Sequence, residues 1–308
     1  MQTQATLEAL DAKLRIVLPS EYKDSYEDVP PVSMGSAGLK FDAAGRVAWD
    51  EIWGSFCDLA MAGGPPHKGK LLEPGTRAEI EAEPDRYRAV VEEICRGVRM
   101  VSDVAVERSP NPGWVRVMCP SPVMAAWLVR AIVMENVSAY AQDNVVELPA
   151  GPHFRLEKEI KNVVTVIAKT CHYFQDHMEA GQQKWIARLF AETGSQLLQP
   201  YRPDDAGAGA VQTQALKAKA GARLFNATGL HVSGTEYGGW LGLECPSVRA
   251  AIWMMRALVV SNVLSRREDK VLYVPLNPIL DPEGDRLAGA VAQVHHLSVT
   301  RGLFLLEM

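Results

Sequence analysis

The chain has 308 residues, of which 47% are hydrophobic and 22% are charged, and its formal net charge is −5. This composition is typical of a globular protein with a sizeable core. The acidic balance argues against nucleic acid as a partner, because nucleic-acid-binding domains carry a basic surface. The two most apolar segments, 122–134 and 248–264, each contain an arginine and are too short to cross a bilayer, so we expect no membrane partner.

Cysteine usage predicts a reducing compartment. The chain has five cysteines, an odd number, and no two of them form a CxxC pair. Secreted disulfide frameworks usually contain an even number at regular spacings. The first twenty residues carry acidic side chains and lack the basic and apolar regions of a signal peptide. We therefore expect a cytoplasmic protein.

The first 46 residues predict a helix followed by an irregular arm. An amphipathic pattern within residues 1–20 indicates a short helix, and a polar segment rich in turn-forming residues follows it. A small hairpin is expected to close on Ala43-Ala44-Gly45. A further helix is expected from about residue 50 to residue 62, where Gly63-Gly64-Pro65-Pro66 ends it.

The remainder of the chain contains an internal repeat. Gly113–Pro152 aligns without a gap with Gly239–Pro278, and 16 of the 40 positions are identical. The segment Ser195–Pro200 matches Gly69–Pro74 at the same offset of 126 positions. Such self-similarity indicates an internal duplication. We predict an N-terminal region (1–46) and two repeats (47–176 and 177–308) that together form one compact unit.

Each repeat is expected to follow the order β-α-β-β-α-β with added helices. The first has expected strands near 70–73, 104–106, 114–118 and 145–148, and helices near 85–99, 121–140 and 156–174. The second has a leading helix near 183–191, helices near 211–223, 248–266 and 283–300, and strands near 229–232, 240–244 and 271–274. This order is that of a ferredoxin-like sandwich. We therefore predict an α+β fold of two tandem ferredoxin-like repeats related by a pseudo-two-fold axis.

Cys119 and Cys245 occupy matched positions just before a predicted helix. The positive end of a helix dipole can lower the pKa of a nearby thiol, which would suit a catalytic nucleophile. The alternation of side chains along the preceding strand instead directs both thiols toward the core, where a free cysteine acts as a small hydrophobe. The sequence leaves both interpretations open.

The opposite face of the same strands carries larger side chains. Trp114 and Arg116 share this face in the first repeat, and Trp240 and Glu244 share it in the second. We expect this face to pack on the other repeat or to bind a ligand.

Matched arginines occur in the apolar helices that follow. Arg130 and Arg256 each lie three residues after a tryptophan and need a partner if buried. A structural ion pair and an anionic ligand are both compatible with them.

The loop after the helix at 50–62 differs between the repeats. It contains His67, Lys68 and Lys70 among glycines and prolines, and the second repeat lacks it. Cationic side chains beside flexible backbone favour an anionic group such as phosphate or carboxylate. The segment does not match a P-loop, which requires GxxxxGK[ST] between a strand and a helix.

A small histidine cluster suggests a metal site. His172 and Asp176 are four residues apart on one helix face, and His296 falls at the corresponding place in the second repeat if two residues are deleted there. This spacing suits two metal ligands or a carboxylate that orients an imidazole. Histidines are also favoured at helix C-termini by the dipole alone.

We expect a protein that binds a small anionic ligand or cofactor, at the repeat interface or under the loop 63–70. One alternative is an enzyme that uses Cys119 or Cys245 as its nucleophile. Another is a non-catalytic assembly subunit with a protein partner or a second copy of itself. No hydrolase, kinase or dinucleotide-binding fingerprint is present, and the sequence identifies no cofactor.

Overall fold

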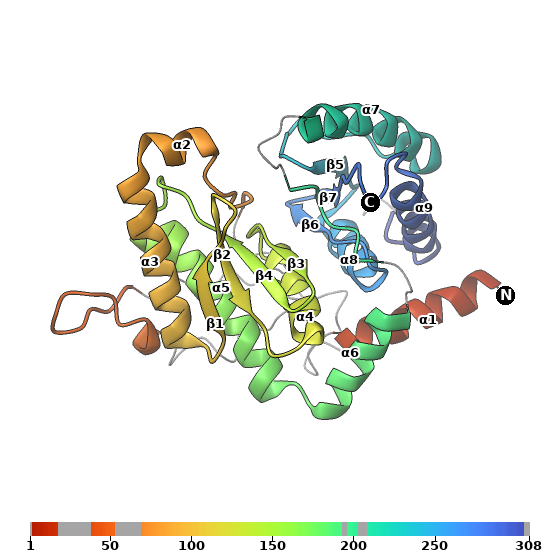
Figure 1. The fold of residues 1–308 in the computed structure, drawn as a ribbon. Helices are drawn as coiled ribbons and strands as arrows, with labels where there is room; N and C mark the ends of the chain where they lie inside the picture. Colours follow the sequence, from red (N-terminus) through yellow and green to blue (C-terminus); the bar gives the residue numbers. More distant parts are fainter. Residues whose placement is uncertain (1, 18–37, 53–68, 193–195, 203–207, 305–308) are drawn as a thin grey trace. The chain divides into compact units, whose positions relative to one another are not determined.

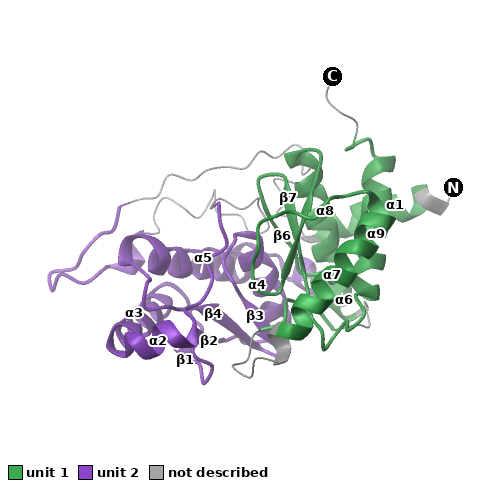
Figure 2. Cartoon of the chain, turned by 90° about the horizontal axis from the view of Figure 1, so that it is seen from above, with its two compact units in different colours: residues 1–30, 185–308 green, residues 31–184 purple. Residues whose placement is uncertain are grey.

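The computed structural model describes residues 2–17, 38–52, 69–192, 196–202 and 208–304. The chain divides into two compact units (Figure 2). One contains residues 31–184 and is called the central unit. The other combines residues 1–30 with 185–308 and is called the terminal unit. Each unit mixes helices with a small antiparallel sheet, so the fold is α+β as predicted.

The central unit holds a four-stranded antiparallel sheet in the order β1-β2-β4-β3 (Figure 1). Two short π-helical segments, η3 and η4, flank its helix α5. Its elements are η2 (Trp49–Ile52), α2 (Arg77–Ala82), α3 (Pro84–Val101), β1 (Ala105–Arg108), β2 (Trp114–Met118), α4 (Pro122–Met134), β3 (Tyr140–Gln142), β4 (Val145–Pro149), η3 (Leu156–Ile160), α5 (Lys161–His172) and η4 (Tyr173–His177).

Local sequence explains where the helices of the central unit begin and end. Thr76 and Glu79 form a reciprocal capping box at the start of α2. Ser121 accepts a hydrogen bond from the backbone of Met124 and caps α4, as expected. This helix ends at Met134 and not near residue 140, because Asn136 adopts a left-handed conformation with φ of 58°. The residues after it form β3.

The core of the central unit lies between the sheet and its helices. α3 contacts β1 and β2, α4 contacts β3 and β4, and α5 contacts both helices. Val115 and Val117 of β2 point into this core together with Cys119, which directly follows the strand, and each is at most 2% exposed. The predicted alternation of this strand is therefore confirmed.

The terminal unit holds a three-stranded antiparallel sheet in the order β5-β7-β6. α8 contacts α1 and α9, and α7 packs along α9. The boundary between the units falls within α6. The elements are α1 (Gln2–Val17), α6 (Ala180–Glu192), α7 (Ala208–Thr228), β5 (Trp240–Glu244), α8 (Val248–Val260), β6 (Arg266–Glu268), β7 (Val271–Pro275) and α9 (Asp285–Thr300).

Matched positions of the two similar segments adopt the same local structure. Asn262 has a φ of 62°, and α8 ends just before it, whereas a helix to residue 266 was predicted. Ser247 caps α8 as Ser121 caps α4. The strand registers also agree, since Trp114 faces Pro149 in β2–β4 and Trp240 faces Pro275 in β5–β7.

The ferredoxin-like arrangement is not confirmed. The expected first strand near 70–73 forms only an isolated parallel bridge between Leu72 and Val137. β4 pairs directly with β2, whereas a split βαβ sandwich places another strand between them. The strand expected near 229–232 is likewise an isolated bridge between Val232 and Leu243. Within the parts of the chain that the structure describes, no helix combines the length and apolar character needed to cross a bilayer.

Candidate functional site

The loop predicted to bind an anion is only partly described. His67 and Lys68 lie outside the described residues, and Lys70 is exposed at the start of the next described segment.

Cys119 and Cys245 are buried thiols. Each is 2% exposed, and burial raises the pKa of each to about 12. The lowering of the pKa expected from the helix dipole does not occur, because desolvation of the thiolate outweighs the dipole. At neutral pH both thiols are protonated, which is the opposite of an activated nucleophile.

The large side chains on the other strand face differ between the units. Trp114 is 5% exposed and packs edge-to-face on Tyr140, with ring centroids 5.0 Å apart. Arg116 lies 3.9 Å from Glu107 in an exposed ion pair. Its neighbour across the sheet, Glu147, is buried and accepts hydrogen bonds from Ser109 at 2.6 Å and from Asn111 at 2.9 Å.

In the terminal unit this face holds a buried guanidinium that the sequence did not single out. Arg266 is fully buried, and its guanidinium carbon lies 4.0 Å from the ring centroid of Tyr273, 4.4 Å from that of Tyr237 and 5.3 Å from that of Trp240. It also forms a 2.7 Å ion pair with Glu268. The strand residue Glu244, which was predicted to share this face in a ligand site, is exposed.

Arg130 and Arg256 are buried inside their helices. They are 2% and 3% exposed. Arg130 donates a 2.7 Å hydrogen bond to the carbonyl of Ala126, one turn earlier, and burial lowers its pKa to about 9. The preceding tryptophans contact other residues: Trp127 packs on Tyr173, with ring centroids 5.6 Å apart, and the ring centroid of Trp253 lies 6.0 Å from the guanidinium carbon of Arg301.

Two members of the predicted histidine cluster form a contact within the central unit. His172 lies 3.1 Å from Asp176, as their spacing predicted, and both lie at or just after the end of α5. His296 belongs to α9 of the terminal unit. Among the described residues, no group of three His, Cys, Asp or Glu side chains is placed to hold a metal ion.

An open cleft of about 540 Å³ lies on the central unit. It is formed by the hairpin at 41–47, by α3 and by the segment around η3. Its volume falls within the range of roughly 300–1,000 Å³ that is typical of small-molecule sites. We call it the arginine cleft. The lining residues are Gly45, Arg46, Val47, Arg86, Ala89, Val90, Glu93, Phe154, Arg155, Leu156, Glu157 and Ile160.

Three arginines line this cleft, and each is anchored through its Nε atom. Nε of Arg46 donates to Asp42 at 3.3 Å, Nε of Arg155 donates to Glu159 at 3.3 Å, and Nε of Arg86 donates to the carbonyl of Pro152. Nη2 of Arg155 also binds Glu159, at 3.2 Å. The remaining terminal nitrogens form no hydrogen bond with another described residue. The three side chains are 53–66% exposed, so a ligand can reach these nitrogens.

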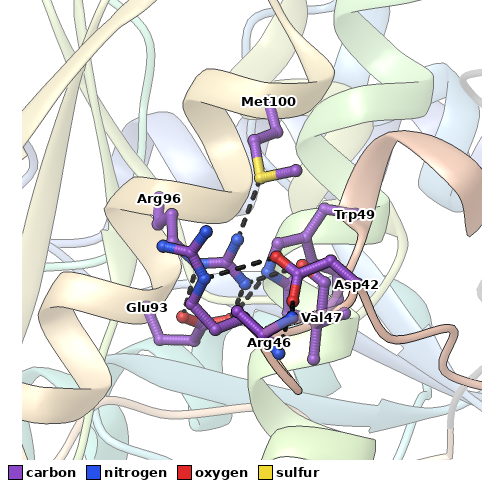
Figure 3. Close-up of polar contacts among 8 residues, drawn as sticks. Asp42, Arg46, Val47, Trp49, Glu93, Arg96 and Met100 are labelled. Carbon is purple, nitrogen blue, oxygen red and sulfur yellow. Dashed lines mark hydrogen bonds and ion pairs between the residues drawn. The ribbon is translucent and has the colours of Figure 1, made fainter.

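The two acidic residues of the cleft have different surroundings. Glu93 accepts hydrogen bonds from Trp49 at 2.8 Å and from Arg96 at 2.6 and 2.8 Å, as Figure 3 shows. Arg96 also donates to the carbonyl of Val47 at 2.7 Å, so it ties the hairpin to α3. Glu157 is exposed and forms no hydrogen bond or ion pair with another described residue.

Comparisons of the chain with protein-family models, with curated proteins and with solved structures found no match. The cleft is therefore interpreted from its own geometry.

The ion pair between Arg155 and Glu159 keeps both of its charges over a wide pH range. Burial acts to raise the pKa of Glu159, but hydrogen bonds from the side chain and backbone of Arg155 outweigh it and lower that pKa to about 2. The same carboxylate raises the pKa of Arg155. Both groups are therefore charged at neutral pH and well to either side of it, and their attraction holds the guanidinium in position.

A smaller cleft of about 340 Å³ is lined by Arg88, Val91, Glu92, Cys95, Arg99 and Arg108. Its thiol is buried, and burial raises the pKa of Cys95. Arg88 is on α3 like Arg86 but does not line the arginine cleft, which makes it a useful control position.

Proposed function

We propose that the protein binds a small anionic ligand in the arginine cleft of the central unit. One observation carries this proposal: three arginines from three separate segments line one cleft, and each is fixed through Nε with terminal nitrogens left accessible. A planar guanidinium recognises carboxylate and phosphate oxygens through such terminal nitrogens. Side chains that are already held in place lose less conformational entropy when a ligand binds.

The proposed ligand is the small anionic ligand predicted from the sequence. The proposed site is the arginine cleft, which the sequence did not predict. The sites predicted at the repeat interface and under the loop 63–70 stay predictions. The tandem repeat origin is also part of the proposal, and it is supported by the agreement of caps, positive-φ residues and strand registers at an offset of 126 positions. Four described cysteines are free thiols, which is compatible with the proposed cytoplasmic location.

The cysteine-dependent enzyme is less well supported than binding. Its two candidate nucleophiles have pKa values raised to about 12, so almost no thiolate is available at neutral pH. A non-catalytic assembly role remains a prediction without a specific contact that favours it.

Titration of the full-length protein with inorganic phosphate, benzoate and L-leucine tests the proposal. Calorimetry or ligand-observed NMR should detect binding of at least one of these three compounds, each of which carries an anionic group. The double variant R86M/R155M should weaken that binding at least about tenfold, since the loss of even one charge-assisted pair costs about 1.4 kcal/mol or more. The control variant R88M should bind as the wild type does. Equal binding by wild type and double variant, or no binding of any probe, would overturn the proposal.

A further inference from the structure

The arginine cleft offers a ligand both signs of charge. Glu157 lines the same cleft as the three arginines. It lies two positions after Arg155, in the segment that supplies both residues to the lining of the cleft. Glu93, by contrast, is occupied by Arg96 and Trp49. The cleft therefore presents arginine donors and one accessible carboxylate.

Apolar residues also line the arginine cleft, and we call them its apolar wall. Val47, Val90 and Ile160 line the cleft and are each at most 5% exposed, and the exposed Ala89 lines it as well. An apolar ligand group that covers this wall would be removed from water, which is favourable in proportion to the area buried.

A purely anionic ligand does not match this arrangement. Bound phosphate or a simple carboxylate would bring its charge close to Glu157, and like charges at short range repel. A purely cationic ligand would face three guanidinium groups. A ligand with a carboxylate, an ammonium group and an apolar body satisfies all the groups at once.

We infer that the ligand of the arginine cleft is a free α-amino acid with an apolar side chain. Its carboxylate binds the terminal nitrogens of the cleft arginines, its ammonium group binds Glu157, and its side chain lies on the apolar wall. The inference rests on the proposed function, because it requires the arginine cleft to be the binding site.

The test compares four compounds on the full-length protein by calorimetry: L-leucine, L-phenylalanine, N-acetyl-L-leucine and L-leucinamide. At least one of the two free amino acids should bind. N-acetyl-L-leucine lacks the ammonium group and L-leucinamide lacks the carboxylate, so each should bind at least about tenfold more weakly than L-leucine.

Variants at Glu157 identify the partner of the ammonium group. E157Q should weaken binding of L-leucine and leave N-acetyl-L-leucine unchanged or improved, so that the difference between the two compounds disappears. The control E92Q changes an exposed glutamate on α3 outside the cleft and should preserve the difference.

The possible failures of the two proposals are distinguishable. If N-acetyl-L-leucine or inorganic phosphate binds as tightly as L-leucine, and R86M/R155M abolishes that binding, the cleft binds anions but the amino-acid inference is wrong. The inference is also wrong if E157Q and E92Q behave alike. If neither amino acid nor any anion binds, both proposals fail.

Discussion

The ammonium group of Lys169 on α5 lies 2.8 Å from a carboxylate oxygen of Glu135, just after the end of α4. Their side chains are only 7% and 4% exposed, so this ion pair is sealed from water. It links α5 to the end of α4, the helix that contacts β3 and β4 of the central unit. The attraction between the two charges offsets the cost of removing both from water, and neither charge would be tolerated there alone.

Removal of one partner should be costly. We expect K169M to lower the free energy of unfolding by roughly 3–5 kcal/mol, because it leaves the Glu135 carboxylate buried without this cation. The control K158M removes a lysine that is 65% exposed and lies 3.5 Å from Glu159, and it should cost at most about 1 kcal/mol. Urea unfolding of both variants measures the difference. Equal effects would show that the buried pair has no special role.

The buried guanidinium of Arg266 should resist even a conservative change. Lysine keeps the charge but lacks the planar group that lies against three aromatic rings and Glu268. We expect R266K to destabilise the terminal unit by about 1–3 kcal/mol. K270R makes the reverse exchange at an exposed turn position and should be close to neutral. Thermal unfolding of both variants measures the difference. Equal losses of stability in R266K and K270R would contradict this interpretation.

Much of the framework could be predicted because short-range rules determine it. Ser121 and Ser247 follow a strand and precede an apolar run, so the N-caps are readable from the sequence. Strand alternation indicated that Cys119 and Cys245 point toward the core, which was one of the two interpretations that the sequence left open. The hairpin at residues 41–47 also forms where its turn residues indicated.

Other features could not be predicted because they depend on long-range packing. α4 ends early because Asn136 adopts a left-handed conformation, which asparagine only sometimes adopts. The sheet order depends on which strands pair, and the order of elements along the chain does not determine it. The arginine cleft joins Arg46, Arg86 and Arg155, which are far apart in sequence and belong to no motif. Two of them carry a sequence signal, an acidic residue four positions away: Asp42 precedes Arg46, and Glu159 follows Arg155.

The buried thiol of Cys119 makes stability depend on alkaline pH. Burial raises its pKa from 9.0 to about 12 in the folded protein. Between these values the unfolded chain loses this proton while the folded protein keeps it, so stability falls as pH rises above about 9. The slope should be about 1.4 kcal/mol per pH unit for this thiol.

The variant C119A isolates this contribution. Its unfolding free energy should fall less steeply between pH 9 and pH 10.5 than that of the wild type, whatever offset the lost side chain causes. In native protein at neutral pH, iodoacetamide should label Cys119 and Cys245 only after denaturation. Rapid labelling of either native thiol would instead favour the cysteine-dependent enzyme.

Hydrogen–deuterium exchange of the full-length protein, with and without inorganic phosphate, benzoate and L-leucine, tests the central claim most directly, because it locates a bound ligand on the backbone. For at least one of these probes, we predict slower exchange in the peptides that cover residues 86–93 and 154–160, and no such change in R86M/R155M. Protection confined to other segments, or no protection by any probe, would contradict a ligand site in the arginine cleft.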